Sequence, residues 1–512
     1  MESRTISKAT WFVAATSFAF CVAPTFISYK PYEFSWDDSD YLLRAIEVNR
    51  AFWTGDVHGL GAAMVSWHTP AMTFLGLPWR HLALRDAPGS CFVALAALIA
   101  LLATTCLYLL LRIGVRPVFL IVASVCVGAS LGPFQAGVHA SHMHDLATRF
   151  LADNLFAWET LATVLLIPYE ARKSNPTISG AALHGILYAA IFSLGALTKV
   201  SFFYFVGLVF PTLLFIRFRY GGIRSAFAWL IAFVCAIAPT TIYFLRYGQS
   251  AFAEGKAASF GGLADFYRVP LWRFLADNIL ESPGMVLSLA LMSAALLYLV
   301  IKKRLVSSAT TSVPGLLAFL IMIGYGIIVF TSANKEIRFA FPVILALPFL
   351  VAILLSNKED SVPAPLAGLA AGLVFLGLAV AVMPMRNRPY QQSLASAEAV
   401  LHQAAVCHAR TILLATDSPS LNVFLMDLTS RLSSSGVSIR TLAYQAMSGA
   451  PIQDDFSTIN NSDMVVFQDA PRLRPKFTNQ RVPEYQEYVQ QEGSVAIRVG
   501  DDTNVYSARC NP

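Results

Sequence analysis

The sequence is poor in charged residues. Asp, Glu, Lys and Arg make up 13% of its 512 residues, whereas a typical soluble domain carries about 25%. The mean hydropathy is +0.58, and runs such as 98–111 and 315–330 are the cores of stretches that reach the ~20 apolar residues needed to cross a bilayer as a helix. This composition excludes an ordinary soluble enzyme and identifies an integral membrane protein.

The sequence also lacks the short motifs of zinc and nucleotide sites. None of its seven cysteines forms a C-x-x-C pair, and five of them fall in predicted spans, where a thiol behaves as a small apolar side chain. The loop after the first C-terminal strand does not have the G-x-G-x-x-G pattern of a phosphate loop. The stretch 139–145 offers His139, His142, His144 and Asp145 but no established metal-site spacing. We therefore assign no metal site and no cofactor, and leave a divalent metal open.

Eleven apolar stretches are predicted to span the membrane. They lie near 9–29, 90–111, 117–136, 150–168, 180–198, 202–216, 226–245, 285–301, 314–331, 338–355 and 364–385. Lys and Arg gather in alternate short loops, and such loops remain in the cytoplasm. This rule predicts a cytoplasmic N-terminus and an outer loop at 30–89. Because the number of spans is odd, it also predicts that the C-terminus faces outward.

The last 127 residues, 386–512, have the pattern of an α/β domain. Strands are predicted at 409–416, 438–444, 463–470, 494–500 and 504–509, and polar helical stretches separate the first four. This part holds eleven Lys and Arg and twelve Asp and Glu, so the net charge of +6 arises in the membrane part, residues 1–385. Such a distribution suits anionic lipid headgroups better than nucleic acid, and no nucleic-acid partner is expected.

Two cysteines bracket the predicted sheet. Cys407 precedes its first strand and Cys510 follows its last. An oxidising compartment permits a disulfide, provided that the two Cα atoms lie within ~7 Å. The short connection 500–504 predicts a final hairpin that would favour this proximity, and the bridge itself is left open.

The stretch 33–56 contains the densest acidic run of the chain. A helix over 36–53 places Asp37, Asp40 and Arg44 on one side and gathers apolar residues on another, as in a helix along a membrane surface. These apolar residues are Tyr41, Leu42, Ala45, Val48, Phe52 and Trp53. A purely structural explanation is also available, because acids suit the first turn of a helix and Asp40 can pair with Arg44 at i,i+4. It explains Asp40 better than Asp37.

The pattern Asp37-Asp38-x-x-Tyr41 after the first span resembles the Asp-Glu-x-x-Tyr signature of GT-C glycosyltransferases. This polytopic group includes protein O-mannosyltransferases and the lipid A aminoarabinose transferase. Four further segments resemble the family's motifs in the family's order, and the resemblance covers roughly residues 10–355. They are 66–76 with His68, 149–163 with Arg149 and Asp153, 194–205 with Lys199, and 335–350 with Arg338.

The resemblance implies a GT-C-like bundle of about eleven transmembrane helices with an extracytoplasmic α/β domain. It implies transfer of a sugar from a polyprenyl-phosphate donor to a glycan, lipid or protein acceptor, on the outer side of a bacterial inner membrane. Asp37 and Asp38 are then the catalytic acids, and Lys199 and Arg338 bind the donor phosphate. The supporting residues are Tyr41, His68, Arg149 and Asp153.

The chain departs from the family pattern at two positions. Asp38 stands where the family usually has Glu, and its side chain is one methylene shorter. Phe339 stands where the family has tyrosine, so a phenol contact is missing. Both departures leave the first acid in place.

Each candidate residue also has a structural explanation. Lys199 ends a predicted span and could extend to the headgroups, Arg338 could anchor beside Glu336, and Arg149 could pair with Asp153 at i,i+4.

The alternative class is a transporter or lipid flippase, which commonly has matching halves and ionisable residues deep within its spans. The chain shows no internal repeat, and its charges concentrate at the outer boundary. A ligand sensor would need a cytoplasmic output module, for which the inward loops are too short.

Overall fold

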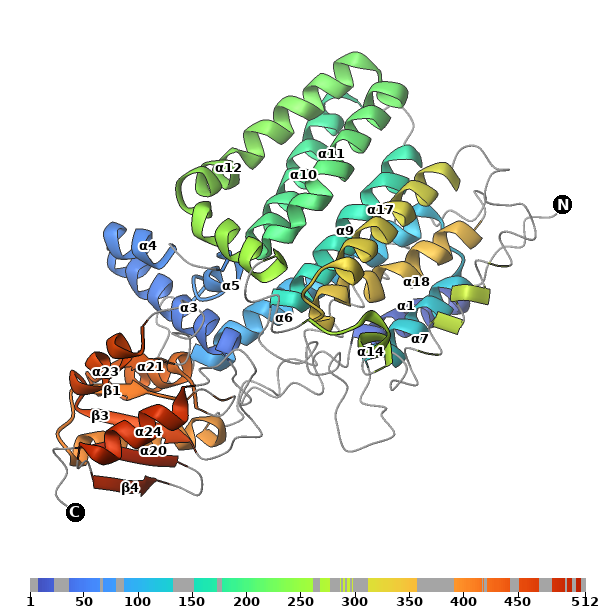
Figure 1. Ribbon diagram of the computed structural model, residues 1–512. Coiled ribbons are helices and arrows are strands. Elements are labelled where there is room, and N and C mark those ends of the chain that lie inside the picture. The colour runs from blue at the N-terminus through green and yellow to red at the C-terminus, as the bar shows by residue number, and fades with distance from the viewer. Residues whose placement is uncertain are drawn as a thin grey trace. The chain divides into compact units, whose positions relative to one another are not determined.

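The computed structural model describes the larger part of the chain as two compact units (Figure 1), each considered by itself. The described residues are 8–22, 36–64, 68–79, 87–131, 152–172, 177–260, 268–276, 286, 289–290, 292–294, 297, 312–356, 391–416, 418, 421–442, 451–468, 481–492, 495–499 and 503–507. The first unit comprises 1–29, 64–72 and 93–386, and the second comprises 30–63, 73–92 and 387–512.

The described residues of the first unit form helices joined by turns and irregular segments, and none of them lies in a strand. Its helices are α1 (Lys8–Val22), α6 (Ala87–Ile113, whose first turns belong to the second unit), α7 (Pro117–Leu131), α9 (Ala152–Arg172), α10 (Ile178–Thr198), α11 (Phe203–Ile216), α12 (Gly222–Phe260), α14 (Leu271–Leu275), α17 (Ser312–Thr331) and α18 (Phe341–Leu355). Short turns join some of them: the 3₁₀ turns η2 (Val200–Phe202) and η5 (Ile337–Ala340), and the π-helical turn η3 (Arg217–Gly221).

Five helical stretches of the described chain are long and apolar enough to cross a membrane. They are 89–113, 178–198, 200–253, 313–331 and 337–355. The predicted spans 202–216 and 226–245 fall together in the third stretch, which turns at Gly222, where φ is +75°. The predicted span 285–301 lies largely, and 364–385 entirely, outside the described residues, so the count of eleven stays a prediction. Helix α12 continues beyond the predicted span 226–245 to Phe260.

Helix α9 is the central element of this unit. It packs against α10, α11, α17 and α18, and nearly all of its residues are buried, as expected for a helix that has protein neighbours on every side. It matches the predicted span at 150–168 but is not one of the five apolar stretches. Asp153, Glu159 and Glu170 account for this, because they lower the hydropathy of a helix that is otherwise apolar.

The second unit contains a five-stranded sheet in the order β2-β1-β3-β5-β4. The strands are β1 (Thr411–Leu414), β2 (Ser438–Thr441), β3 (Met464–Gln468), β4 (Val495–Val499) and β5 (Thr503–Ser507), with helices α20 (Gln391–Val406), α21 (Val423–Leu432), α23 (Ile452–Asn460) and α24 (Val482–Gln491). Strands β1, β2 and β3 pair in parallel, and β5 pairs antiparallel with β3 and with β4. All five predicted strands and the final hairpin are confirmed.

Burial and a disulfide stabilise the sheet domain. Leu413, Phe467 and Tyr485 are fully buried members of its core, and burying one such side chain contributes about 1.5–3 kcal/mol. Cys407 is disulfide-bonded, whereas the five other cysteines of the described residues are free. Cys510 lies outside the described residues, so its pairing with Cys407, which the sequence left open, stays open here.

The acidic run forms helix α3 (Trp36–Thr54), which confirms the helix predicted at 36–53. Phe52 and Trp53 are 48% and 43% exposed, whereas Asp40 is only 4% exposed. Asp40 is accommodated there because both of its oxygens accept hydrogen bonds from Arg44 Nε, at 3.0 and 2.9 Å, which is the predicted i,i+4 pair.

The described fold therefore groups α3 with the C-terminal sheet domain. Helix α3 packs against α21, and residues 30–63 and 387–512 belong to one compact unit. The division predicted from sequence, 1–385 and 386–512, separates these segments, because it follows chain order and hydropathy alone.

Candidate functional site

The turn after α10 presents Lys199. The helix ends at Thr198, and Lys199 adopts an extended conformation while its N–H still donates to Gly195 O at 3.1 Å. Gly195 permits this turn, since a Cβ there would lie 2.4 Å from the ring of Phe202. The Leu-Thr-Lys segment singled out in the sequence is thus a sharp helix-to-3₁₀ junction.

The ammonium group of Lys199 lies between one carboxylate and two aromatic rings. It forms an ion pair with Asp153 at the start of α9. Its Nζ also lies 4.9 Å from the ring centroid of Phe339 and 5.9 Å from that of Phe156, within the range of cation–π attraction. An ammonium has three N–H donors, and among the described residues only Asp153 accepts one. Lys199 can therefore donate two further hydrogen bonds while remaining fixed.

Arg338 lies beside the same aromatic ring. Its Nε donates to Glu336, which confirms the proximity predicted from the sequence, and its Cζ lies 5.5 Å from the ring centroid of Phe339. Phe339 therefore contacts both candidate cations. The ring does this without the hydroxyl that the resembled family carries at this position.

The turn before Arg338 is held by the end of α17. Lys335 Nζ donates to the carbonyl oxygens of Phe330 and Ser332, two acceptors that a helix C-terminus leaves open. Burial lowers the pKa of Lys335. The backbone N–H of Glu336 donates to Asn334 Oδ1 at 3.1 Å. These bonds fix the segment from which Arg338 projects.

Thr198 joins three distant segments of the chain. Its hydroxyl donates to Glu159 Oε1 at 2.7 Å and contacts Leu194 O at 2.8 Å. Its carbonyl oxygen accepts a hydrogen bond from Thr69 Oγ1. The residue following His68, the middle of α9 and the Lys199 turn are thereby brought together, as the order of the sequence motifs led us to expect of a common site.

Glu159 was not predicted from the sequence. It is fully buried, and among the described residues its Oε2 has no hydrogen-bond partner. The available signal was an acidic residue in the middle of a predicted span, because ionisable groups within the membrane mark functional positions by default.

The acidic candidates lie in the second unit. Asp37 is half-buried in the first turn of α3 and Tyr41 is 5% exposed. Asp38 belongs to the same helix, but its side chain lies outside the described part of the chain. Their proposed role beside Lys199 and Arg338 stays a prediction.

The remaining candidates have different outcomes. His68 is half-buried next to Thr69, whereas Arg149 and the segment 139–145 lie outside the described residues. Asp153 pairs with Lys199; its pairing with Arg149 stays open. No group of three or more metal-ligating residues occurs in the described part of the chain.

A second buried polar cluster lies towards the other end of α9. Arg217 Nε lies 2.8 Å from Glu170 Oε1, and Arg217 Nη2 lies 2.7 Å from His184 Nδ1. Tyr188 donates its hydroxyl hydrogen to Glu170. Because arginine can only donate, His184 Nδ1 is the acceptor in this contact. The cluster ties α9 and α10 to the turn η3.

The sequence matches no protein-family model and no curated protein. A solved structure does match: the crystal structure of ArnT from Cupriavidus metallidurans bound to undecaprenyl phosphate. The TM-score is 0.52 and the identity 14%, over 98% of this chain and 99% of that one. ArnT is a lipid A aminoarabinose transferase of the GT-C superfamily. Identity at this level is informative about the fold alone, and along almost its whole length this chain has the fold of that structure.

Proposed function

We propose that this protein is a membrane glycosyltransferase that moves a sugar from a polyprenyl-phosphate donor to an acceptor on the outer side of the membrane. The observation that carries the proposal is Lys199, a cation held by Asp153 and Phe339, whose two other N–H donors have no acceptor among the described residues. The solved structure with the same fold holds undecaprenyl phosphate, the type of anion that such a cation binds.

The chemistry assigns a role to each candidate. The acceptor oxygen attacks the anomeric carbon of the donor sugar, and the bond from that carbon to the phosphate oxygen breaks. Asp37 takes the acceptor proton as general base, with Asp38 beside it, and polyprenyl phosphate leaves as the anion. Lys199 and Arg338 stabilise the negative charge on the phosphate, since fixed charges near a developing charge are usually the largest catalytic contribution.

The donor and acceptor are identified first by lipid and glycan profiling of cells with and without the gene. Sugar transfer is then measured with purified protein in lipid nanodiscs. We expect Asp37→Asn to abolish transfer, because the substitution preserves shape and removes the base. Asp40→Asn is the matched control, since an amide oxygen can still accept from Arg44. Near-normal turnover by Asp37→Asn would exclude Asp37 as the base.

A transporter or lipid flippase is the second candidate. Glu159 and Glu170, both buried within α9, are the kind of intramembrane acids that transporters use. This alternative predicts movement of a polyprenyl-phosphate lipid between leaflets of proteoliposomes without formation of a glycosylated product. Product formation that depends on Asp37 would exclude it.

A further inference from the structure

Helix α3, which carries Asp37 in its first turn, is held on two sides within its unit. On one side Asn49 Nδ2 donates to the carbonyl oxygens of Gly76, at 2.8 Å, and Trp79, at 2.5 Å. Gly76 lies so close that a Cβ on it would be 2.4 Å from Ala45 O. On the other side α3 packs against α21 of the sheet domain. The buried face of α3 is therefore shared between its own loop and a segment almost four hundred residues later.

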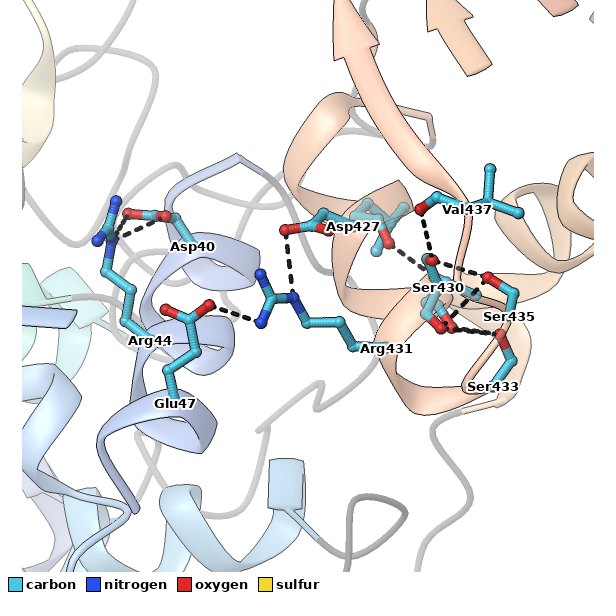
Figure 2. A network of polar contacts seen from close by, with 11 residues as sticks. Asp40, Arg44, Glu47, Asp427, Ser430, Arg431, Ser433, Ser435 and Val437 are labelled. Carbon is cyan, nitrogen blue, oxygen red and sulfur yellow. Dashed lines mark hydrogen bonds and ion pairs between the residues drawn. The ribbon is translucent and has the colours of Figure 1, made fainter. Parts of the chain in front are cut away.

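An ion pair joins the two helices. Arg431 Nη1 lies 2.7 Å from Glu47 Oε1 on α3, and Arg431 Nε lies 3.5 Å from Asp427 Oδ2 on its own helix. Figure 2 shows the guanidinium between these two carboxylates. Helices α3 and α21 pack against each other around this ion pair, and Val48 on α3 and Leu425 on α21 are both fully buried.

The end of α21 that carries Arg431 is itself fixed to the sheet. Ser430 Oγ lies 2.7 Å from Ser435 Oγ and 3.2 Å from Val437 O, a network also drawn in Figure 2. Val437 directly precedes β2, which pairs with β1 along its whole length. The other end of α21 is capped by Asn422, whose Oδ1 accepts from Leu425 N at 2.9 Å.

We propose that the C-terminal α/β domain is the support that fixes α3, so that sugar transfer depends on the contact between α3 and α21. The connection runs from the sheet through β2 and α21 to Glu47, and along α3 for ten residues, or about 15 Å, to Asp37. Glu47 and Arg431 are positioning residues that act through the helix. The inference rests on the proposed function only because it takes Asp37 as the catalytic base.

Charge exchange in the full chain tests this support. Glu47→Arg places two guanidinium groups together, and Arg431→Glu places a third carboxylate beside those of Glu47 and Asp427. We expect each variant to lower kcat for transfer by about 3- to 10-fold, with little change in the donor KM. The effect is modest because the pair is partly exposed, and like charges in its place destabilise the contact between α3 and α21. Hydrogen exchange of the segment 36–54 should accelerate in both variants.

The double variant Glu47→Arg/Arg431→Glu restores opposite charges. We expect kcat and exchange of 36–54 to recover partly, since Asp427 then faces a glutamate. Arg440→Glu is the matched control: the residue is exposed on β2 and changes the net charge of the domain equally. It should match the unaltered protein in both measurements.

The outcomes separate this inference from the proposed function. The inference that the α/β domain supports α3 would be rejected if the single variants kept unaltered kcat and hydrogen exchange. It would also be rejected if the double variant showed no recovery. Hydrogen exchange of 36–54 could accelerate in the single variants and recover in the double variant while Asp37→Asn still transfers sugar. That result would confirm that the α/β domain supports α3 and would reject Asp37 as the catalytic base.

Discussion

Arg217 and Glu170 form a buried ion pair 2.8 Å apart, with side chains 1% and 2% exposed. Breaking a buried pair by removing one partner leaves an uncompensated charge and costs about 3–5 kcal/mol, whereas replacing both partners with apolar residues is often neutral. We expect Glu170→Gln to lower the melting temperature markedly and Glu170→Met/Arg217→Met to restore most of it. Thermal unfolding in nanodiscs measures this effect. Equal destabilisation by both variants would contradict it.

The hydroxyl of Thr198 should affect donor use. Thr198→Val removes the donor to Glu159 and leaves the buried carboxyl without that partner, at a cost of about 1–3 kcal/mol. We expect a higher donor KM, because the turn carrying Lys199 loses its anchor. Thr198→Ser retains the hydroxyl and should stay near normal.

The matched control is Thr163→Val on α9. The Thr163 hydroxyl is buried and has no hydrogen-bond partner in the described part of the chain, so its loss should be neutral or mildly stabilising. Glu159→Gln keeps an acceptor oxygen and should retain more activity than Glu159→Leu. If Thr198→Val and Thr198→Ser gave the same donor KM, the hydroxyl would have no such role.

Lys199 and Arg338 should govern donor binding rather than acceptor binding. We expect Lys199→Ala and Arg338→Ala to weaken binding of undecaprenyl phosphate, with smaller changes in acceptor KM. Arg224→Ala is the control, because this exposed cation lies at the start of α12. Titration of nanodiscs with undecaprenyl phosphate provides the measurement. Unchanged binding by both variants would reduce these residues to interface anchors.

The ring of Phe339 should contribute to the same binding. Phe339→Leu removes the cation–π contacts to both cations, each of which is worth about 0.5–2 kcal/mol. We expect weaker undecaprenyl phosphate binding than in the unaltered protein. Phe339→Tyr preserves the ring and should bind at least as well. A leucine variant with full affinity would show that the ring does not position the cations.

The disulfide of Cys407 should stabilise the sheet domain. Cys510 is the predicted partner, and closing a loop of about a hundred residues contributes up to ~4.7 kcal/mol in the chain-entropy model. We expect peptide mapping without reduction to find Cys407 joined to Cys510, and Cys407→Ser to lower the melting temperature. A modified, free Cys510 would reject this pairing.

The sequence predicted elements whose signal is local. Alternating apolar residues located all five strands, and the acidic run located α3, since periodicity requires no knowledge of neighbours. The burial of Asp40 and the exposure of Trp53 were not predicted, because the surroundings of α3 are set by Ala45 against Gly76 and by the packing on α21. These contacts join residues far apart in the chain, which periodicity does not register.

The candidate site was likewise predictable only in part. Lys199, Asp153 and Arg338 were singled out as separate motifs, and the structure adds Phe339 as the ring that both cations share. The role of Thr198 was not predictable, since its hydroxyl and carbonyl contact residues 39 and 129 positions away. The junction requires the packing of α9 against α10 and the approach of the segment that carries Thr69.

The charged residues of α9 affect how the protein enters its membrane. An acidic residue at the centre of a helix costs about 2.5–3.5 kcal/mol on insertion scales, and Glu159 lies near the middle of α9. If α9 left the translocon without a partner helix, this carboxyl would be exposed to lipid. The contacts of α9 with Thr198 and Lys199 at the end of α10 provide partners for its acidic side chains. We therefore expect α9 and α10 to enter the bilayer together, and variants that lose these contacts to be inserted less efficiently.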